Sequence, residues 1–168
     1  MAIFPFTPSQ TAQFQFQPTL DNEVYSATVP WSLFGARFYL SLTALQGALV
    51  WYGAVVGSPP SLSIESLSWA NGIVSVQTAV PHGFKPASTI SLTIDGCTPS
   101  AYNGLVAAMI TGADTFSYLL ASNPGAATVL GIADYRLNLL GGVPNENGDY
   151  FSSTLLFRPS ANQFETYP

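Results

Sequence analysis

Charged side chains are scarce in this chain. They make up 8% of its 168 residues, against about 25% in a typical soluble domain. Only Lys85, Arg37, Arg136 and Arg158 are basic, and the formal net charge is −5. Nucleic-acid binding needs clustered positive charge to displace counterions from phosphates, and binding to anionic membranes has the same requirement. The sequence therefore argues against nucleic acid and membranes as partners.

The scarcity of charge also bears on the state of the protein in solution. Charged residues normally keep a free-standing domain soluble and protect the edges of its sheets. Here serine, threonine, asparagine and glutamine must cover the surface instead. This composition favours a permanent assembly, and the alternative is a monomer with a neutral, hydroxyl-rich surface.

Residues that carry catalysis or bind metals are equally few. The single cysteine, Cys97, permits no intrachain disulfide, and one cysteine with one histidine cannot form a zinc site. His82 stands in a Pro-His-Gly turn, where we expect it to bond the local backbone rather than act as a catalytic base. No Gly-x-Ser-x-Gly or Ser-x-x-Lys motif occurs. We predict that the protein is not an enzyme and uses no metal or cofactor.

Two weaker patterns lead to the same prediction. Residues 145–149, Asn-Glu-Asn-Gly-Asp, are rich in oxygen but lack the spacing and the terminal glutamate of a calcium loop. Their Asn-Gly pair predicts a turn. Asp21 with Glu23, or Asp95 with Asp114, would be formal glycosidase pairs, but nothing in the sequence places either pair in a cleft.

One segment has the length of a membrane span. Residues 38–56 are uncharged and largely apolar. Side chains nevertheless alternate at period two over 34–43, with Phe34 inward and Arg37 outward, and Gln46-Gly47 divides the run. The pattern therefore predicts a β-hairpin and no membrane insertion. The start of the chain has no basic region and no long apolar run, so we expect no signal peptide.

Polar and apolar residues alternate along most of the chain, and no segment predicts a helix. Residues 1–10, with Pro5 and Pro8, have the character of an extended arm. The expected strands are 13–17, 23–29, 34–43, 49–56, 62–67, 73–79, 89–95, 104–111, 115–120, 127–132, 135–140, 150–157 and 163–167. Short strands with turn signals about every ten residues are typical of an all-β sandwich or barrel.

The chain is expected to contain an insertion. Residues 57–61, Gly-Ser-Pro-Pro-Ser, form a breaker cluster, and insertions are tolerated at exposed turns of this kind. Residues 1–61 and 134–168 hold all three arginines and most aromatic residues, whereas 62–133 is rich in serine, threonine, alanine and glycine. We predict a small β-barrel or sandwich host, 1–61 with 134–168, interrupted by a β-sandwich-like module over 62–133.

The host segments resemble a family of small plug-type structural proteins in the baseplates of contractile phage tails. The resemblance lies in FPFTPSQTAQFQFQPTLD at 4–21, VPWSLFGARFYL at 29–40, LNLL at 137–140, STLLFR at 153–158 and QFE at 163–165. It covers about 90 residues and contains no catalytic motif. It implies a structural role in a virion, in the tail baseplate near the hub and tube.

The middle segment resembles a small immunoglobulin-like β module that recurs in phage tail and virion proteins. The resemblance lies in GIVSV at 72–76, PHGF at 81–84, TPSAYNG at 98–104 and DTFSY at 114–118. It implies a module displayed on a surface, and it carries little information on function.

These observations predict a structural protein that packs against other baseplate proteins and against copies of itself, as a trimer or hexamer ring. The candidate subunit-interface residues are Arg37, Arg158, Phe4, Phe6 and Trp31. An outward arginine in so uncharged a chain suits a carboxylate of a neighbouring subunit, although it could equally be solvated. The alternative functions are a carbohydrate-binding or host-recognition module, with exposed tryptophan or tyrosine residues in a flat row, and a hydrolase with an unrecognised site.

Overall fold

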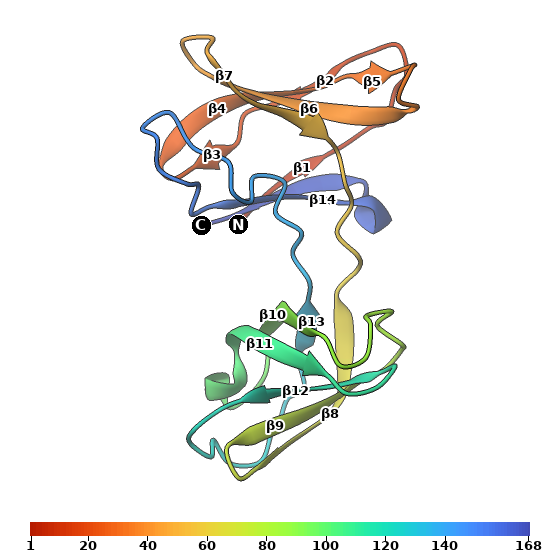
Figure 1. The fold of residues 1–168 in the computed structure, drawn as a ribbon, viewed down its shortest axis with the longest axis vertical. Helices are drawn as coiled ribbons and strands as arrows, with labels where there is room; N and C mark the ends of the chain where they lie inside the picture. Colours follow the sequence, from red (N-terminus) through yellow and green to blue (C-terminus); the bar gives the residue numbers. More distant parts are fainter. The chain divides into compact units, whose positions relative to one another are not determined.

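The computed structural model describes residues 1–168 and confirms an all-β protein (Figure 1). The chain divides into two compact units. Met1–Pro59 with Leu137–Pro168 form one, the host unit, and Pro60–Arg136 form the other, the barrel unit. The boundaries fall at 59/60 and 136/137, where the sequence predicts 61/62 and 133/134.

One sheet of the host unit joins the two ends of the chain. It holds β1 (Ala2–Pro5), β15 (Gln163–Tyr167) and β14 (Thr154–Arg158), all antiparallel, in the order β1-β15-β14. Phe6 follows β1, and its backbone N–H donates to the carbonyl of Asn162 at 2.7 Å. The expected N-terminal arm is therefore a paired edge strand of this sheet.

The second sheet of the host unit is built on one long hairpin. β4 (Glu23–Val29) and β5 (Trp31–Ser32) pair in a single register with β6 (Arg37–Ala44), interrupted only at Pro30. The outer neighbours are β2 (Phe14–Phe16) and β3 (Thr19–Leu20) beside β4, and β7 (Leu49–Ala54) beside β6. The hairpin predicted around Gln46-Gly47 is thus present as β6 and β7.

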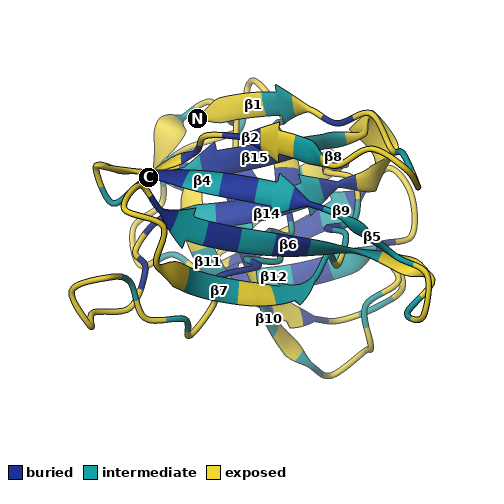
Figure 2. Cartoon of the chain, turned by 90° about the horizontal axis from the view of Figure 1, so that it is seen from above, coloured by how far each residue is buried: buried dark blue, intermediate teal, exposed yellow.

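Aromatic side chains fill the space between these two sheets. Phe164 is fully buried, and its ring centroid lies 5.0 Å from Phe16, 5.0 Å from Phe157 and 5.5 Å from Phe6. Along β4 every second residue is buried, including Tyr25, as strict alternation requires (Figure 2). The prediction that Phe14 and Phe16 face inward is confirmed, since both belong to this cluster.

The barrel unit is a single closed sheet. Its strands are β8 (Leu62–Ala70), β9 (Ile73–Thr78), β10 (Thr89–Asp95), β11 (Gly104–Ile110), β12 (Thr115–Leu119) and β13 (Ile132–Asp134). They run in the order β10-β11-β12-β9-β8-β13, and β13 pairs back onto β10. Gly131 makes this closure possible, because a Cβ there would lie 1.8 Å from the carbonyl oxygen of Asp95. The module is thus a barrel, where the sequence predicts a sandwich-like, immunoglobulin-like fold.

Two expected strands and the orientation of Phe34 also differ from the structure. Residues 127–131 and 135–140 form no strand; β13 occupies only 132–134, and Leu140 reaches the host core from an irregular segment. Phe34 lies in the turn between β5 and β6 and is fully exposed rather than inward-facing.

Helix is confined to two short 3-10 turns, and no helix has the length and hydrophobicity of a membrane span.

We expect Phe164→Ala to lower the free energy of unfolding of the host unit by about 3–5 kcal/mol, because it removes the ring at the centre of the aromatic cluster. Denaturant unfolding followed by tryptophan fluorescence would measure the loss. Phe34→Ala, at a fully exposed position, is the matched control and should change stability by less than about 0.5 kcal/mol. Equal losses in the two variants would contradict the assignment of the core.

Candidate protein interface

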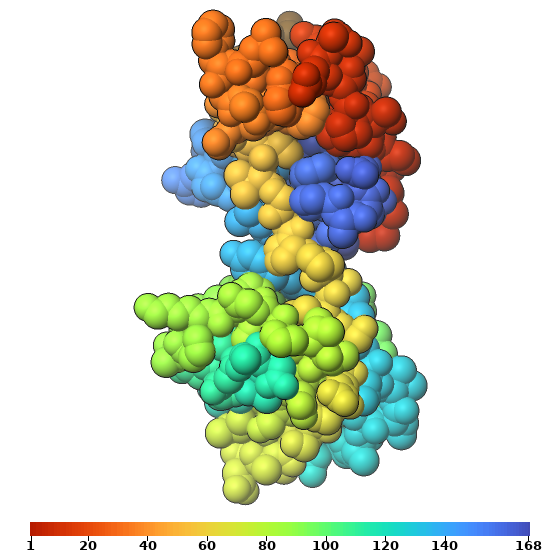
Figure 3. All heavy atoms as spheres, turned by 90° about the vertical axis from the view of Figure 1, so that its right-hand side faces the viewer, coloured from red at the N-terminus to blue at the C-terminus, as the bar shows by residue number.

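A hydrophobic turn projects from one end of the host unit. Leu33, Phe34, Gly35 and Ala36 connect β5 to β6, and we refer to these four residues with Arg37 as the hairpin tip. Leu33 is 80% exposed, and Phe34 is fully exposed. Figure 3 looks at this end, where the segment in orange that contains the tip lies at the surface. Leu33 and Phe34 are adjacent, so the tip presents apolar surface that is available to a partner.

The tip is held in shape by its own hydrogen bonds and by the strand beneath it. The Ser32 hydroxyl accepts from the backbone N–H of Gly35 at 3.2 Å, and Arg37 Nε donates to the Gly35 carbonyl at 3.2 Å. Trp31 packs edge-on against Phe38, with ring centroids 4.8 Å apart. The tip is therefore pre-organised, which lowers the entropic cost of seating it in a partner.

A pocket of about 580 Å³ lies at the other end of the host unit. Its lining includes Ala2, Phe4, Gln17, Thr19, Asp21 and Tyr167, and we call it the terminal pocket. Its volume falls within the range of about 300–1,000 Å³ that is usual for ligand pockets. It combines an aromatic wall with one carboxylate, and so can accept an apolar group next to a cation.

The Asp21 carboxylate is fixed in place by the loop before β14. Its Oδ1 accepts from the Ser152 hydroxyl at 2.7 Å and from the Ser153 N–H at 2.8 Å, and its Oδ2 accepts from the Ser152 N–H at 3.1 Å. Partial burial tends to raise the pKa of Asp21, but these hydrogen bonds outweigh it and lower the pKa to about 2. The Asp21 side chain is therefore ionised at neutral pH.

Strand β7 offers a second exposed surface. It is an edge strand without a charged residue, and Leu49 and Tyr52 on it are more than half exposed. Its pairing with β6 shifts register between Leu42 and Thr43, which leaves an extra residue on β7 as in a bulge, one of the features that hinder edge strands from pairing with another chain. The Tyr52 ring stacks on Tyr39 at 5.3 Å and 9°, so these two rings lie face to face rather than side by side.

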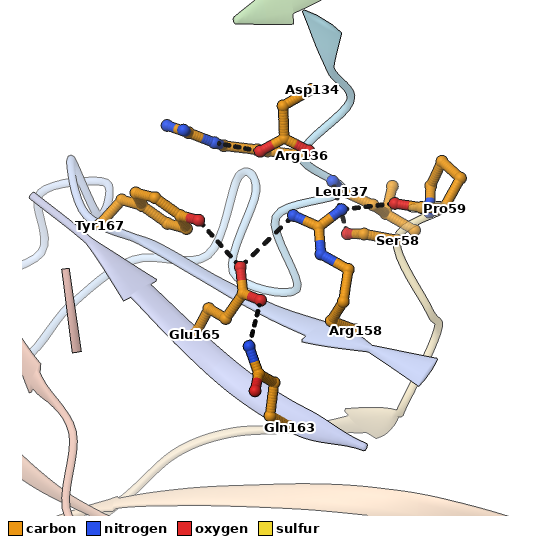
Figure 4. Close-up of polar contacts among 9 residues, drawn as sticks. All are labelled: Ser58, Pro59, Asp134, Arg136, Leu137, Arg158, Gln163, Glu165 and Tyr167. Atoms are coloured by element: carbon orange, nitrogen blue, oxygen red, sulfur yellow. Dashed lines mark hydrogen bonds and ion pairs between the residues drawn. The ribbon is translucent and has the colours of Figure 1, made fainter. Parts of the chain in front are cut away.

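Arg158 lies at the point where the chain leaves and re-enters the host unit (Figure 4). Its Nη1 donates to the carbonyl of Pro59, and its Nη2 lies 3.4 Å from Glu165 Oε2. Next to it, the Ser58 hydroxyl accepts from the backbone N–H of Leu137 at 3.0 Å. The Ser58–Leu137 hydrogen bond thus links the outgoing and returning segments, and Arg158 ties the outgoing segment to β15; we call this group of contacts the junction.

The carboxylate of Glu165 is the centre of the junction. Burial tends to raise its pKa, but hydrogen bonds from Gln163 at 2.7 Å and from Tyr167 at 2.9 Å, together with Arg158, lower the pKa below its usual value. The Arg158–Glu165 pair is buried on both sides. Removing one partner of such a pair leaves an uncompensated charge and typically costs several kcal/mol.

The five predicted interface residues fall into three places. Arg37 and Trp31 form or support the hairpin tip, and Phe4 lines the terminal pocket. Phe6 and Arg158 are buried inside the host unit, in the aromatic core and in the junction. Their burial gives them roles within the chain, so they are not part of the exposed surface. The sequence did not single out Phe34 or Asp21 as candidates for a contact surface.

Other singled-out residues have local partners. His82 is buried, its Nδ1 accepts from the backbone N–H of Phe84 at 3.1 Å, and its Nε2 lies 3.4 Å from the Thr115 carbonyl. The expectation that His82 bonds the local backbone is confirmed. Trp69 donates to the Leu120 carbonyl at 2.7 Å. All three tryptophans are half-buried, and none lies in a flat exposed row.

We expect the host unit to lose stability as the pH falls from about 5 to about 2. The pKa values of Asp21 and Glu165 are lower in the folded protein than in the unfolded chain. Their contribution is therefore complete above the unfolded values near 4 and is lost as they become protonated. Asp21→Asn should be less stable than wild type at pH 7 by at most about 2 kcal/mol, and by less at pH 2.5.

Denaturant unfolding at several pH values would measure this difference. Asp149→Asn removes an exposed carboxylate of the same unit and controls for the change in net charge. A gap between wild type and Asp21→Asn that stays constant from pH 7 to pH 2.5 would contradict the assigned hydrogen bonds.

Comparison with protein-family models, with curated proteins and with solved structures found no match for this chain. The resemblance to plug-type baseplate proteins and to an immunoglobulin-like tail module thus stays a prediction from the sequence.

Proposed function

We propose that this protein is a structural component of a contractile phage tail, located in the baseplate near the hub and tube. It acts by packing against copies of itself and against other tail proteins in a symmetric ring. The sequence resemblance of the host segments supplies the setting. One structural observation carries the mode of action: the host unit exposes Leu33 and Phe34 on a rigid turn while its surface has very few charges.

The exposed surfaces suit permanent contacts. The adjacent exposed side chains of Leu33 and Phe34, and the exposed Leu49 and Tyr52 of the uncharged strand β7, present apolar surface whose burial by a neighbour is favourable. The two surfaces lie on the same unit, so one subunit can make more than one contact. Two contacts per subunit are the minimum that a ring or a multi-protein baseplate requires.

Carbohydrate binding is the rival function. A glycan platform needs aromatic faces that are open to the sugar ring. Tyr52 is exposed but stacks one face on Tyr39, Tyr150 is exposed in the loop before β14 with no ring contact to another aromatic residue, and Trp31, Trp51 and Trp69 are half-buried. The surface therefore favours protein contacts over sugar contacts.

Electron microscopy of a virion that contains this chain would test the proposed location. We expect density for the host unit on the tail axis, in the baseplate, repeated with the symmetry of the ring. Labelling the barrel unit with an antibody fragment would identify the chain in the map. Density found only at the tips of fibres, away from the tail axis, would contradict the proposal and favour host recognition.

A further inference from the structure

We propose that the hairpin tip of one copy seats in the terminal pocket of the next copy, so that host units join head to tail. Phe34 enters the pocket, and Arg37 pairs with Asp21 of the receiving copy. The inference rests on the proposed assembly function and specifies its contact.

The two surfaces lie at opposite ends of the host unit. Asp21 lies in the turn before β4, and the tip follows β5, which continues β4 in the same register. The seven residues of β4 alone span roughly 23 Å at about 3.3 Å per residue. Figures 1 and 2 place β5 at one end and both chain termini at the other end of this unit. A tip therefore cannot reach the pocket of its own copy.

The chemistry of the two surfaces is complementary. The tip offers apolar side chains beside a guanidinium, and the pocket offers the ring of Phe4 beside the carboxylate of Asp21. Asp21 Oδ1 already accepts two hydrogen bonds, whereas Oδ2 accepts one. A carboxylate oxygen has two acceptor sites, so Oδ2 retains capacity for a guanidinium N–H. An arginine–carboxylate contact shielded by an aromatic residue is typical of interface hot spots.

The distribution of charge favours a second copy as the occupant. The host unit contains five acidic residues and two arginines, and Arg158 is buried in the junction. Arg37 is therefore its only exposed basic residue, and it stands beside the most exposed aromatic side chain. Its complement, an anchored carboxylate in an apolar pocket, is present on the same unit. Two different surfaces of one chain that fit each other make a heterologous contact, which closes into a ring when the rotation permits.

Two variants test this contact with the full chain, prepared without a terminal tag because Met1 and Pro168 line the pocket. The tip variant combines Phe34→Ser with Arg37→Glu. The pocket variant is Thr19→Arg, which places a bulky cation at the pocket. All three positions are exposed, so the fold should be kept, and circular dichroism would verify this. Leu119→Ser, at an exposed leucine of the barrel unit, is the matched control.

Mass photometry and sedimentation velocity would measure assembly. We expect the wild type and Leu119→Ser to form closed rings, and each interface variant to raise the dissociation constant about 30-fold or more. An equimolar mixture of the two variants retains one intact contact, between the tip of the pocket variant and the pocket of the tip variant. The mixture should therefore give heterodimers and nothing larger.

Three results would overturn the contact: a wild type that stays monomeric at its solubility limit, a tip variant that still assembles as the wild type does, or a mixture without heterodimers. If the wild type and both variants assemble equally, another surface such as β7 joins the copies, and the proposed structural function stands without this contact. Fibre-tip density in the virion would instead remove the proposed function, even if the contact forms.

Discussion

The single register between β4, β5 and β6 is the constraint on which the host unit depends. It runs from Tyr25 paired with Ala44 to Ser32 paired with Arg37, with only Pro30 interrupting the assigned strand. A slip by one residue would turn Tyr25 and Leu40 out of the core and move every side chain to the other face. The same register places the turn with Phe34 at one end of the hairpin and Asp21 at the other. The register of the hairpin therefore determines both the packing of the core and the positions of the hairpin tip and the terminal pocket.

The junction lets this host unit carry a second unit without losing its own sheets. Ser58 and Arg158 tie the outgoing and returning segments to each other and to β14. Gly57 is required there, since a Cβ at this position would lie 2.2 Å from Pro159. The hydrogen bonds of Glu165 favour its charged form beside Arg158, so a buried ion pair joins β14 to β15 in addition to the packing of Phe157 on Phe164. The barrel unit, closed on itself, offers no unpaired strand to compete with the host sheets.

Local patterns in the sequence predict the strands well and the long-range contacts poorly. Alternation is sufficient for β4, where Tyr25, Ala27 and Val29 are buried as expected. It fails at Phe34, because the alternation continues through residues that form a turn. Gly35 is the only sign of this turn in the sequence, and the positive φ of Ala36 is visible only in the structure. It also fails at β13, a three-residue strand whose pairing closes the barrel. Asp21 and Arg158 could not be assigned, because Ser152 and Pro59, which bond them, lie 131 and 99 positions away.

The central claim is that host units meet tip to pocket, and covalent trapping tests it most directly. Cys97 is the only native cysteine and is buried, so Leu33→Cys combined with Thr19→Cys places the only accessible thiols at the two surfaces. Under mild oxidation, we expect a ladder of covalent multimers on a non-reducing gel, with position 33 of one copy linked to position 19 of the next. Thiols that stay free, in a protein that nevertheless assembles, would contradict it.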